Sequence, residues 1–374
     1  MSRAAGNEPP EPLRVAVIGA GFMGVTHARA IRAAGAVVEI VVVRQSDQLE
    51  AARHRVGARR STLDLDAVLN RPDLDVVHIC TPNASHAAIA FAAIAAGKHV
   101  VCEKPLTTDG ASATALAAAA TSRALIGAVP FVYRFHPMVR EMRTRIGAGE
   151  LGYPSVVHGS YLQDWLADPE AGNWRIDPEA AGPSRAFADI GSHWFDLLEF
   201  VTGDRVQAVS GQLKTVFGSR NGDPIRTEDA ASVQFRTEAG VLGSMVVSQT
   251  AAGRKNRLHL EVSGNESSLA FDQEDPERLW AGRTDETRLL QRDPGRLGAE
   301  AARYAFLPAG HPQGLQDCFN ALVGDVYQAI AGETPSGLPT FADGARAAQL
   351  CEAVLTSAAT DSSWVETDFP EGHR

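Results

Sequence analysis

The chain has 374 residues, of which 44% are hydrophobic and 21% charged, and it carries a formal net charge of -10 with a pI near 5.6. The length predicts two domains, and the composition is that of a soluble globular protein. The negative charge, with no basic patch interleaved with aromatic residues, argues against nucleic acid or an anionic membrane surface as a partner.

The opening segment and the cysteines favour a reducing compartment. Residues 1–12 are polar and rich in Pro and Glu, without the cationic and apolar regions of a signal peptide. No apolar run approaches the roughly 18 residues of a membrane span. The cysteines Cys80, Cys102, Cys318 and Cys351 are widely spaced and show no zinc-binding pattern. We therefore expect a cytoplasmic protein with buried thiols, no membrane partner and no metal site.

The first predicted unit is a strand, a glycine-rich turn and a helix. The apolar run 13–18 has strand length, and a helical pattern covers 22–33. Between them, Gly19 permits a tight turn, Gly21 lets the backbone approach a pyrophosphate, and Gly24 lets helix and strand pack closely. The amides of the new helix then face the phosphates. This turn predicts a dinucleotide site.

The rest of the first half alternates buried strands with helices, as parallel α/β units require. Predicted strands cover 37–43, 76–80, 100–102 and 125–129, and predicted helices cover 47–56, 64–70, 85–96 and 109–122. We expect a Rossmann-type dinucleotide-binding domain over residues 12–130.

The sequence pattern of the second half differs from that of the first half and predicts an α+β domain over residues 131–370. Successive strands joined by polar turns favour a large open, mostly antiparallel sheet over further βαβ units. The predicted strands are 155–161, 205–215, 230–235, 241–250, 258–264 and 267–271, and the predicted helices are 137–146, 194–201, 315–331 and 341–359. Residues 163–188 read as a loop, and residues 276–312 give no clear pattern.

Two short motifs follow neighbouring strands of the first domain. Thr81-Pro82-Asn83 comes after the strand 76–80, and Glu103-Lys104-Pro105 comes after the strand 100–102. Ligands of doubly wound sheets bind beyond these strand ends. Asn83 can cap the next helix or contact a cofactor, and Lys104 either points into the cleft or forms a solvated pair with Glu103.

A third motif lies in the second half. If the chain is helical from about Ile190, Asp189 and His193 are four residues apart and share one face. A carboxylate beside an imidazole raises the imidazole pKa and suits a proton acceptor near neutral pH. The alternatives are a capping Asp189 and a His193 that only fills the core.

Six motifs between residues 14 and 203 together resemble the glucose-fructose oxidoreductase / inositol dehydrogenase / rhizopine-catabolism family of NAD(P)-dependent oxidoreductases. They are Gly19-x-Gly21-x-x-Gly24-x-x-His27, Thr81-Pro82-Asn83-x-x-His86, Glu103-Lys104-Pro105, Arg134-x-x-Pro137, Trp174-Arg175 and Asp189-x-x-x-His193-x-x-Asp196.

The resemblance implies roles for individual residues. Lys104, Asp189 and His193 match the family's catalytic trio. The stretch from Tyr161 to Pro169 is similar to the levoglucosan dehydrogenase branch, which implies that Gln163 and Trp165, with Tyr133, hold a sugar ring; Trp165 as plain interface core is the alternative. Positions expected around the cofactor are Gly19, Gly21, Phe22, Met23, Gly24, Arg44, Thr81, Pro82, Asn83, His86, Glu103, Lys104, Arg134, Trp174 and Arg175.

Two stretches depart from the family pattern. Gln45 stands where NAD-specific members have an acidic residue for the ribose 2′-hydroxyl, and the preceding Arg44 can reach a 2′-phosphate. We therefore expect an NAD(P) cofactor with NADP favoured and NAD tolerated, although Arg44 stacking on adenine or facing solvent is an equal alternative. Residues 181–187 replace the usual glycine-rich approach to Asp189, which leaves the shape of that pocket wall open.

The expected function is hydride transfer between a nicotinamide cofactor and a secondary hydroxyl of a sugar, anhydrosugar or cyclitol. A redox-assisted glycosidase and a non-catalytic dinucleotide-binding sensor are the alternatives that the resemblance leaves, and the intact trio weighs against the sensor. In the strand 241–250, apolar residues alternate on both faces with few charges. This pattern predicts that the open sheet is covered in a homodimer or homotetramer.

Overall fold

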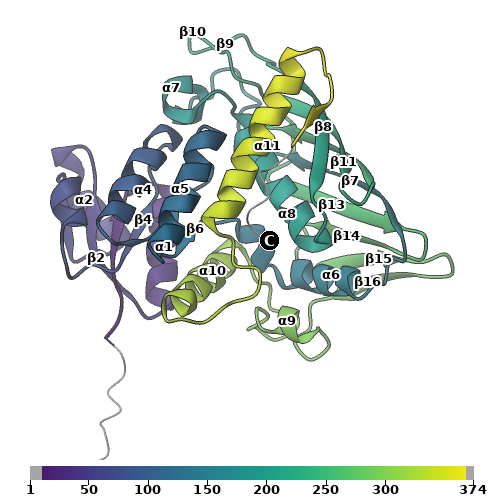
Figure 1. Ribbon diagram of the computed structural model, residues 1–374, viewed down its shortest axis with the longest axis horizontal. Helices are drawn as coiled ribbons and strands as arrows, with labels where there is room; N and C mark the ends of the chain where they lie inside the picture. Colours follow the sequence, from purple (N-terminus) through teal and green to yellow (C-terminus); the bar gives the residue numbers. More distant parts are fainter. Residues whose placement is uncertain (1–10, 368–374) are drawn as a thin grey trace, which may run out of the picture.

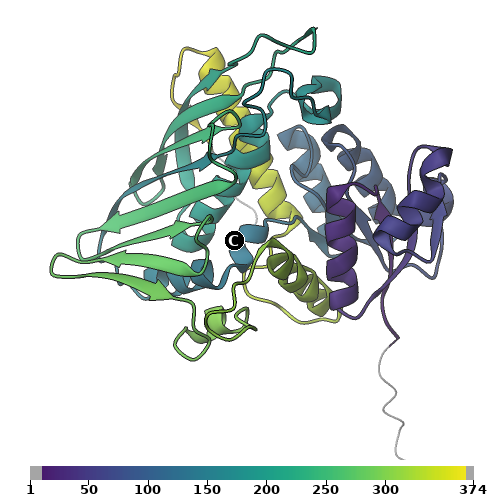
Figure 2. The ribbon, with the colours of Figure 1, turned by 180° about the vertical axis from the view of Figure 1, so that it is seen from behind.

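The computed structural model describes residues 11–367, so most of the polar opening segment and the last residues of the expected second domain lie outside the described range. The chain forms two sheets with helices packed between and around them (Figure 1). The first sheet, with its helices, occupies the left of Figure 1 and the second sheet the right, and Figure 2 shows the same arrangement from behind.

The first sheet has six parallel strands in the order β3-β2-β1-β4-β5-β6. Apart from the edge strand β3, its strands are buried on both faces, which explains their near-continuous apolar runs. The strands are β1 (Arg14–Ile18), β2 (Val37–Val42), β3 (Arg60–Thr62), β4 (Val76–Ile79), β5 (His99–Cys102) and β6 (Gly127–Ala128), and the helices are α1 (Phe22–Ala33), α2 (Leu49–Val56), α3 (Leu65–Leu69), α4 (His86–Ala95) and α5 (Gly110–Ser122). The predicted Rossmann fold is confirmed.

The second sheet has nine strands in the order β16-β15-β14-β13-β7-β12-β11-β8-β17. Only the central pair, β7 and β12, is parallel, so the prediction of a mostly antiparallel sheet is confirmed. The strands are β7 (Pro154–Leu162), β8 (Val206–Lys214), β11 (Ala230–Thr237), β12 (Leu242–Ser248), β13 (Arg257–Gly264), β14 (Ser268–Asp272), β15 (Arg278–Gly282), β16 (Thr287–Gln291) and β17 (Val365–Glu366), with a separate hairpin of β9 (Ser219–Arg220) and β10 (Asp223–Pro224).

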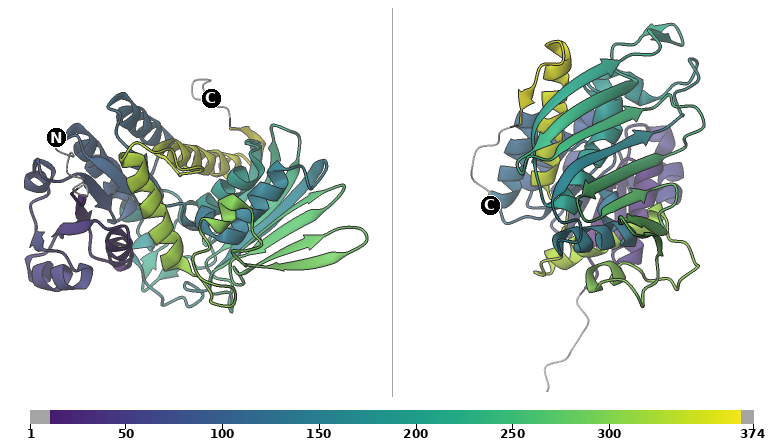
Figure 3. Two further views of the ribbon diagram at one scale, coloured as in Figure 1. Left: turned by 90° about the horizontal axis from the view of Figure 1, so that it is seen from below. Right: turned by 90° about the vertical axis from the view of Figure 1, so that its right-hand side faces the viewer.

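Among residues 11–367, helices cover one face of this sheet and leave the other uncovered. The inner face packs on α6 (Pro137–Gly147) and α8 (Ser192–Thr202), and α9 (Ala299–Ala302) lies beside α6. On β12, Met245 and Val247 are buried, whereas Leu242 is 62% and Val246 is 45% exposed. The right-hand view of Figure 3 looks onto this open face.

Two helices from the end of the chain return to the first sheet. The helix α10 (Leu315–Ile330) packs on α1, and α11 (Phe341–Ala359) packs on both α5 and β8 between the two sheets (Figures 1 and 3). The backbone of Thr340 also bridges Ala128 of β6. Within residues 11–367, none of the helices combines the length and apolarity needed to cross a bilayer.

Candidate active site

The glycine turn after β1 forms a cradle for an anion. Gly19 has a φ of +98°, and Gly21 begins α1 with an extended backbone. A Cβ at Gly24 would lie 2.2 Å from the Gly19 carbonyl oxygen, whereas a Cβ at Gly21 would meet nothing within 4 Å. Gly21 therefore borders open space at the positive end of a helix, and this space fits the pyrophosphate of a dinucleotide. At the same helix start, Phe22 is exposed and Met23 half-buried.

The end of β2 presents cations and no carboxylate at the predicted ribose position. Arg44 is exposed, and the Gln45 side chain accepts a hydrogen bond from Gln48. From α2, Arg55 donates to the Ala20 carbonyl at 3.3 Å, which places a second guanidinium beside the glycine turn. Arg55 was not singled out from the sequence, because only the fold brings the end of α2 to this turn.

The turn after β4 joins the two parts of the chain. Asn83, in the short helix η2 (Asn83–Ser85), donates to the Ala181 carbonyl at 3.0 Å, in the helix α7 (Pro178–Ala181). His86 is buried, and its ring nitrogens lie 2.8 Å from the carbonyl oxygens of Thr81 and Pro105. These contacts connect the turn after β4 to the turn after β5. Pro82 is the residue immediately before η2. They give Asn83 and His86 structural partners at the positions expected near a cofactor.

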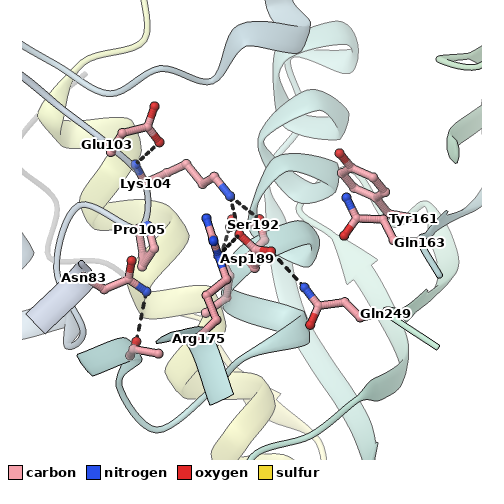
Figure 4. A network of polar contacts seen from close by, with 12 residues as sticks. Asn83, Glu103, Lys104, Pro105, Tyr161, Gln163, Arg175, Asp189, Ser192 and Gln249 are labelled. Carbon is pink, nitrogen blue, oxygen red and sulfur yellow. Dashed lines mark hydrogen bonds and ion pairs between the residues drawn. The ribbon is translucent and has the colours of Figure 1, made fainter. Parts of the chain in front are cut away.

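Glu103 and Lys104 point in different directions from the end of β5. The Glu103 carboxylate is buried, lies 3.0 Å from His27 Nε2 and accepts the Lys104 backbone N–H at 3.2 Å. Lys104 Nζ reaches across the cleft and donates to the backbone oxygen of Asp189 at 2.8 Å and to its Oδ1 at 2.5 Å (Figure 4). Lys104 therefore extends from the first sheet to Asp189, while Glu103 turns to His27 on the other side.

Asp189 accepts hydrogen bonds from three directions. Besides Lys104, Arg175 Nε lies 3.3 Å from Oδ1, and Gln249 Nε2 donates to Oδ2 at 2.8 Å (Figure 4). Burial raises the pKa of Asp189, but the Lys104 ammonium and the Arg175 guanidinium outweigh burial and hold this pKa well below its usual range. Asp189 is thus ionised, and Gln249, which follows β12, is a site residue that sequence reasoning missed.

The expected pairing of Asp189 with His193 is wrong. Asp189 lies in the π-helix η5 (Phe187–Gly191), whose wider turn changes which residues share a face, and its carboxylate turns to Lys104, Arg175 and Gln249 instead. His193 Nδ1 is buried and has no partner among the described residues. Burial and the Lys104 charge lower the pKa of His193 well below its ordinary value, where the sequence predicted a rise. His193 is therefore a neutral imidazole.

Aromatic and amide side chains form a wall beside His193. The ring centroids of Tyr133 and Tyr161 lie 5.0 Å and 6.5 Å from that of His193. Gln163 follows β7 next to Tyr161 (Figure 4), and Trp165 donates its indole N–H to Gln163 Oε1 at 2.9 Å. The predicted sugar-binding residues are thus brought together next to the predicted proton acceptor.

Arg134 differs from its expected role. It lies in the short helix η3 (Val132–Phe135), and its guanidinium pairs with Asp196 of α8 and, at 2.8 Å, with Asp343 of α11. The side chain is only 8% exposed, so Arg134 links three elements instead of offering a free cation to a cofactor. By contrast, Arg175 in η4 (Trp174–Ile176) reaches the cleft, and its guanidinium lies 4.5 Å from the centroid of the Trp174 ring.

Residues 181–187, which depart from the family pattern, are anchored by a buried carboxylate. Glu228 Oε1 accepts from Ser184 Oγ at 2.7 Å, from the Arg185 N–H at 2.9 Å and from the Phe187 N–H at 2.8 Å. The next residue, Asp229, pairs with Arg185 at 2.5 Å. Side-chain bonds from the two residues that precede β11 (Ala230–Thr237) thus hold the segment that leads into Asp189. Among residues 11–367, no group of three or more His, Cys, Asp or Glu is arranged to hold a metal ion.

Comparisons with known proteins match both halves of the chain. Residues 13–131 match the family described as "Oxidoreductase family, NAD-binding Rossmann fold", and residues 139–270 match the "GFO/IDH/MocA C-terminal domain". Levoglucosan dehydrogenase from Pseudarthrobacter phenanthrenivorans is 33% identical over 95% of this chain and 98% of its own length.

Solved structures show the same similarity. The crystal structure of an oxidoreductase domain protein from Kribbella flavida is 36% identical and superposes with a TM-score of 0.89, covering 96% of this chain and 100% of that one. A levoglucosan dehydrogenase in complex with NADH and levoglucosan is 31% identical with a TM-score of 0.89, covering 95% of this chain and 99% of that one.

Proposed function

Because the chain belongs to the Gfo/Idh/MocA oxidoreductase family, we propose that it oxidises or reduces a secondary hydroxyl of a sugar, anhydrosugar or cyclitol with a nicotinamide dinucleotide. One observation carries the proposal. The Lys104–Asp189 ion pair and the neutral His193 lie beside an aromatic and amide wall at the C-terminal edge of a dinucleotide fold. The relative that covers nearly the whole chain is named for a dehydrogenase of an anhydrosugar.

The cofactor would be held chiefly by the first domain. The amides at the start of α1 and the space at Gly21 fit a pyrophosphate, and the turn of Thr81 and Pro82 lies at the neighbouring strand end. When bound, the nicotinamide accepts or delivers a hydride. We propose that NADP is preferred and NAD tolerated, because Gln45 cannot repel a 2′-phosphate and Arg44 and Arg55 both lie on this side of the fold. Because the similar levoglucosan dehydrogenase structure contains NADH, the affinities of this protein for NADP and NAD need to be compared directly.

The remaining chemistry belongs to the residues of the cleft. An alcohol is a very weak acid, so oxidation needs a positioned base and a positive charge near the oxygen that loses its proton. His193 is buried and unprotonated, so its imidazole can accept that proton, and its lowered pKa makes it a weaker base than the sequence predicted. Lys104, held by Asp189, would donate a hydrogen bond to the same oxygen. The roles of Lys104 and His193 can be exchanged.

A screen of sugars, anhydrosugars and cyclitols tests this function. With NADP+ or NAD+ present, we expect at least one of them to produce reduced cofactor, followed at about 340 nm. Sugar release from a glycoside without such accumulation would identify the glycosidase instead. Dinucleotide binding with no turnover of any sugar would contradict the enzyme and favour the sensor.

We further propose that the open sheet face is covered by a second copy of the chain. Large apolar side chains on four strands of this face are exposed: Val156, Leu242, Val246, Trp280 and Leu289. They form two groups, one on β7 and β12 and one on β15 and β16, with polar residues of β13 between them. Exposed apolar groups of this kind favour association. A closed homodimer, or a homotetramer built from it, would bury the face symmetrically.

A further inference from the structure

A closed hydrogen-bond network connects the side chains of the wall beside His193, which are Tyr133, Tyr161, Gln163 and Trp165. Asn256 lies at the centre of this network. Asn256 precedes β13 and is half-buried. Its Oδ1 accepts from Gln163 Nε2 at 2.7 Å and from the Tyr161 hydroxyl at 2.8 Å, and its Nδ2 donates to the Tyr133 hydroxyl at 3.2 Å. The hydroxyls of Tyr133 and Tyr161 are also hydrogen-bonded to each other. One amide thus contacts three side chains of the wall.

The direction of every bond follows from one obligatory donor. The indole N–H of Trp165 can only donate, so the end of Gln163 that faces it is the carbonyl oxygen. The NH2 end of Gln163 then faces Asn256, which must present its oxygen there. Asn256 consequently turns its NH2 group to Tyr133. Because the Tyr161 proton is donated to Asn256, the proton between the two tyrosines comes from Tyr133.

These hydrogen-bond directions determine which donors and acceptors of the wall remain available to a ligand. The donors of Trp165, Tyr133 and Tyr161 are all used within the network. Each primary amide carries two N–H donors and an oxygen with two lone pairs. Gln163 therefore keeps one free N–H and one free lone pair, and Tyr133 can only accept.

The network also lies next to the proposed proton acceptor. Tyr133 contributes to it and packs edge-on against His193, with ring centroids 5.0 Å apart. A sugar hydroxyl placed against this wall therefore meets a fixed pattern of donors and acceptors beside the reacting oxygen. A pattern of this kind discriminates by leaving mismatched polar groups unpaired.

We propose that Asn256 is a positioning residue that sets substrate specificity, by fixing Gln163 as donor and acceptor and Tyr133 as acceptor toward the sugar ring. The assignment rests on the proposed function. Asn256 selects among sugars that differ in the configuration of the hydroxyl facing this wall. The residue comes from a loop outside every motif found in the sequence.

Two substitutions test the assignment. Asn256→Asp keeps the shape and the acceptor for Gln163 and Tyr161 but cannot donate to Tyr133, so Tyr133 must turn its proton away from Tyr161. Asn256→Leu removes all three bonds at similar volume. Asn265→Asp is the matched control, because Asn265 lies after the other end of β13 and uses its Oδ1 only to accept the Tyr153 N–H at 2.6 Å.

The readout is the ratio of kcat/KM between the best sugar and its epimers. We expect both Asn256 variants to change this ratio by about tenfold or more, mainly through KM. The cofactor Kd should match the control. A uniform loss for all sugars, or an unchanged ratio in both variants, would overturn the assignment and leave Asn256 a structural residue.

Sugar binding separates this assignment from the proposed reaction. Dissociation constants of the same sugars, measured by calorimetry in a His193→Ala background, report the wall without turnover. If the ratio of dissociation constants between sugars changes when Asn256 is substituted, the assignment is supported even if the wild type turns over no sugar. Absence of turnover alone would refute only the proposed reaction. Absence of both binding and turnover would refute both.

Discussion

The glycines of the first turn are required for different reasons, and alanine substitutions at Gly21 and Gly24 distinguish these reasons. A Cβ at Gly24 would lie 2.2 Å from the backbone oxygen of Gly19, so Gly24→Ala forces α1 away from β1. A Cβ at Gly21 meets nothing within 4 Å, and its φ of -73° suits alanine. Gly24→Ala should therefore damage the fold, whereas Gly21→Ala should damage only the site.

The expected sizes are distinct. Overpacking of the kind caused by Gly24→Ala costs about 1–3 kcal/mol, which lowers Tm by about 1–4 °C for a chain of this length. Gly21→Ala meets no steric strain but replaces glycine with a poorer helix N-cap residue, which costs about 0.5–1 kcal/mol. The new methyl group occupies the space assigned to the pyrophosphate, however, and loss of one hydrogen bond to a charged group costs about 1.5–3 kcal/mol. This cost raises the cofactor Kd by about 10- to 150-fold.

Thermal unfolding of the cofactor-free variants and titration with NADP+ and NAD+ measure both effects. Gly21→Ala should unfold within about 1 °C of the wild type and bind the dinucleotide weakly. Wild-type affinity in Gly21→Ala would refute the assignment of this turn as the pyrophosphate site. A Gly24→Ala variant as stable as the wild type would refute the packing argument.

Three further predictions concern the cofactor, the assembly and pH. Arg44→Ala should weaken NADP binding by about 1.5–3 kcal/mol and leave NAD binding nearly unchanged, as measured by calorimetry; unchanged NADP affinity, or about tenfold tighter NAD binding by the wild type, would show that the preference is wrong. Sedimentation at micromolar concentration should give a dimer or larger species that Leu242→Glu dissociates, and a monomeric wild type would contradict the covered sheet face. Burial lowers the pKa of His136 to about 4. The unfolded chain therefore binds a proton that the fold excludes, and stability falls as pH drops from about 6.5 to about 4. His136→Phe preserves ring packing on Tyr133 and Phe271 and should reduce this slope by up to about 1.4 kcal/mol per pH unit, whereas identical Tm–pH curves would refute the assignment.

Local patterns were sufficient to predict the first domain. Apart from β3, its strands are buried on both faces and its turns carry glycines, so each of these elements has a signal within its own residues. The missed strand, β3 (Arg60–Thr62), is a three-residue edge strand with no buried residue. In the second domain, β16 (Thr287–Gln291) was missed for a similar reason, because it is an edge strand with no buried residue. The strand β15 (Arg278–Gly282) was also missed, although its buried Leu279 and Ala281 alternate with exposed residues.

The candidate site was predicted by position but not by partner. Lys104 was placed in the cleft because it follows a parallel strand, and this placement needs no tertiary detail. The partners of Asp189 could not be predicted, because the π-helix around it depends on packing that involves Glu228, more than thirty residues away. Gln249 and Asn256 lie in the connection between β12 and β13, and only the pairing of these strands with β7 brings them to the site.

Turnover of a His193→Ala variant tests the central claim most directly, namely that the cleft of Lys104, Asp189 and His193 carries out hydride transfer with a sugar. Loss of a general base typically costs about 10²–10⁴-fold in rate. We expect kcat for the best sugar to fall by at least about 100-fold, while the dinucleotide Kd stays at its wild-type value because the glycine turn is untouched. Wild-type turnover in His193→Ala, together with an active Lys104→Ala variant, would contradict the account and leave a dinucleotide-binding protein whose chemistry lies elsewhere.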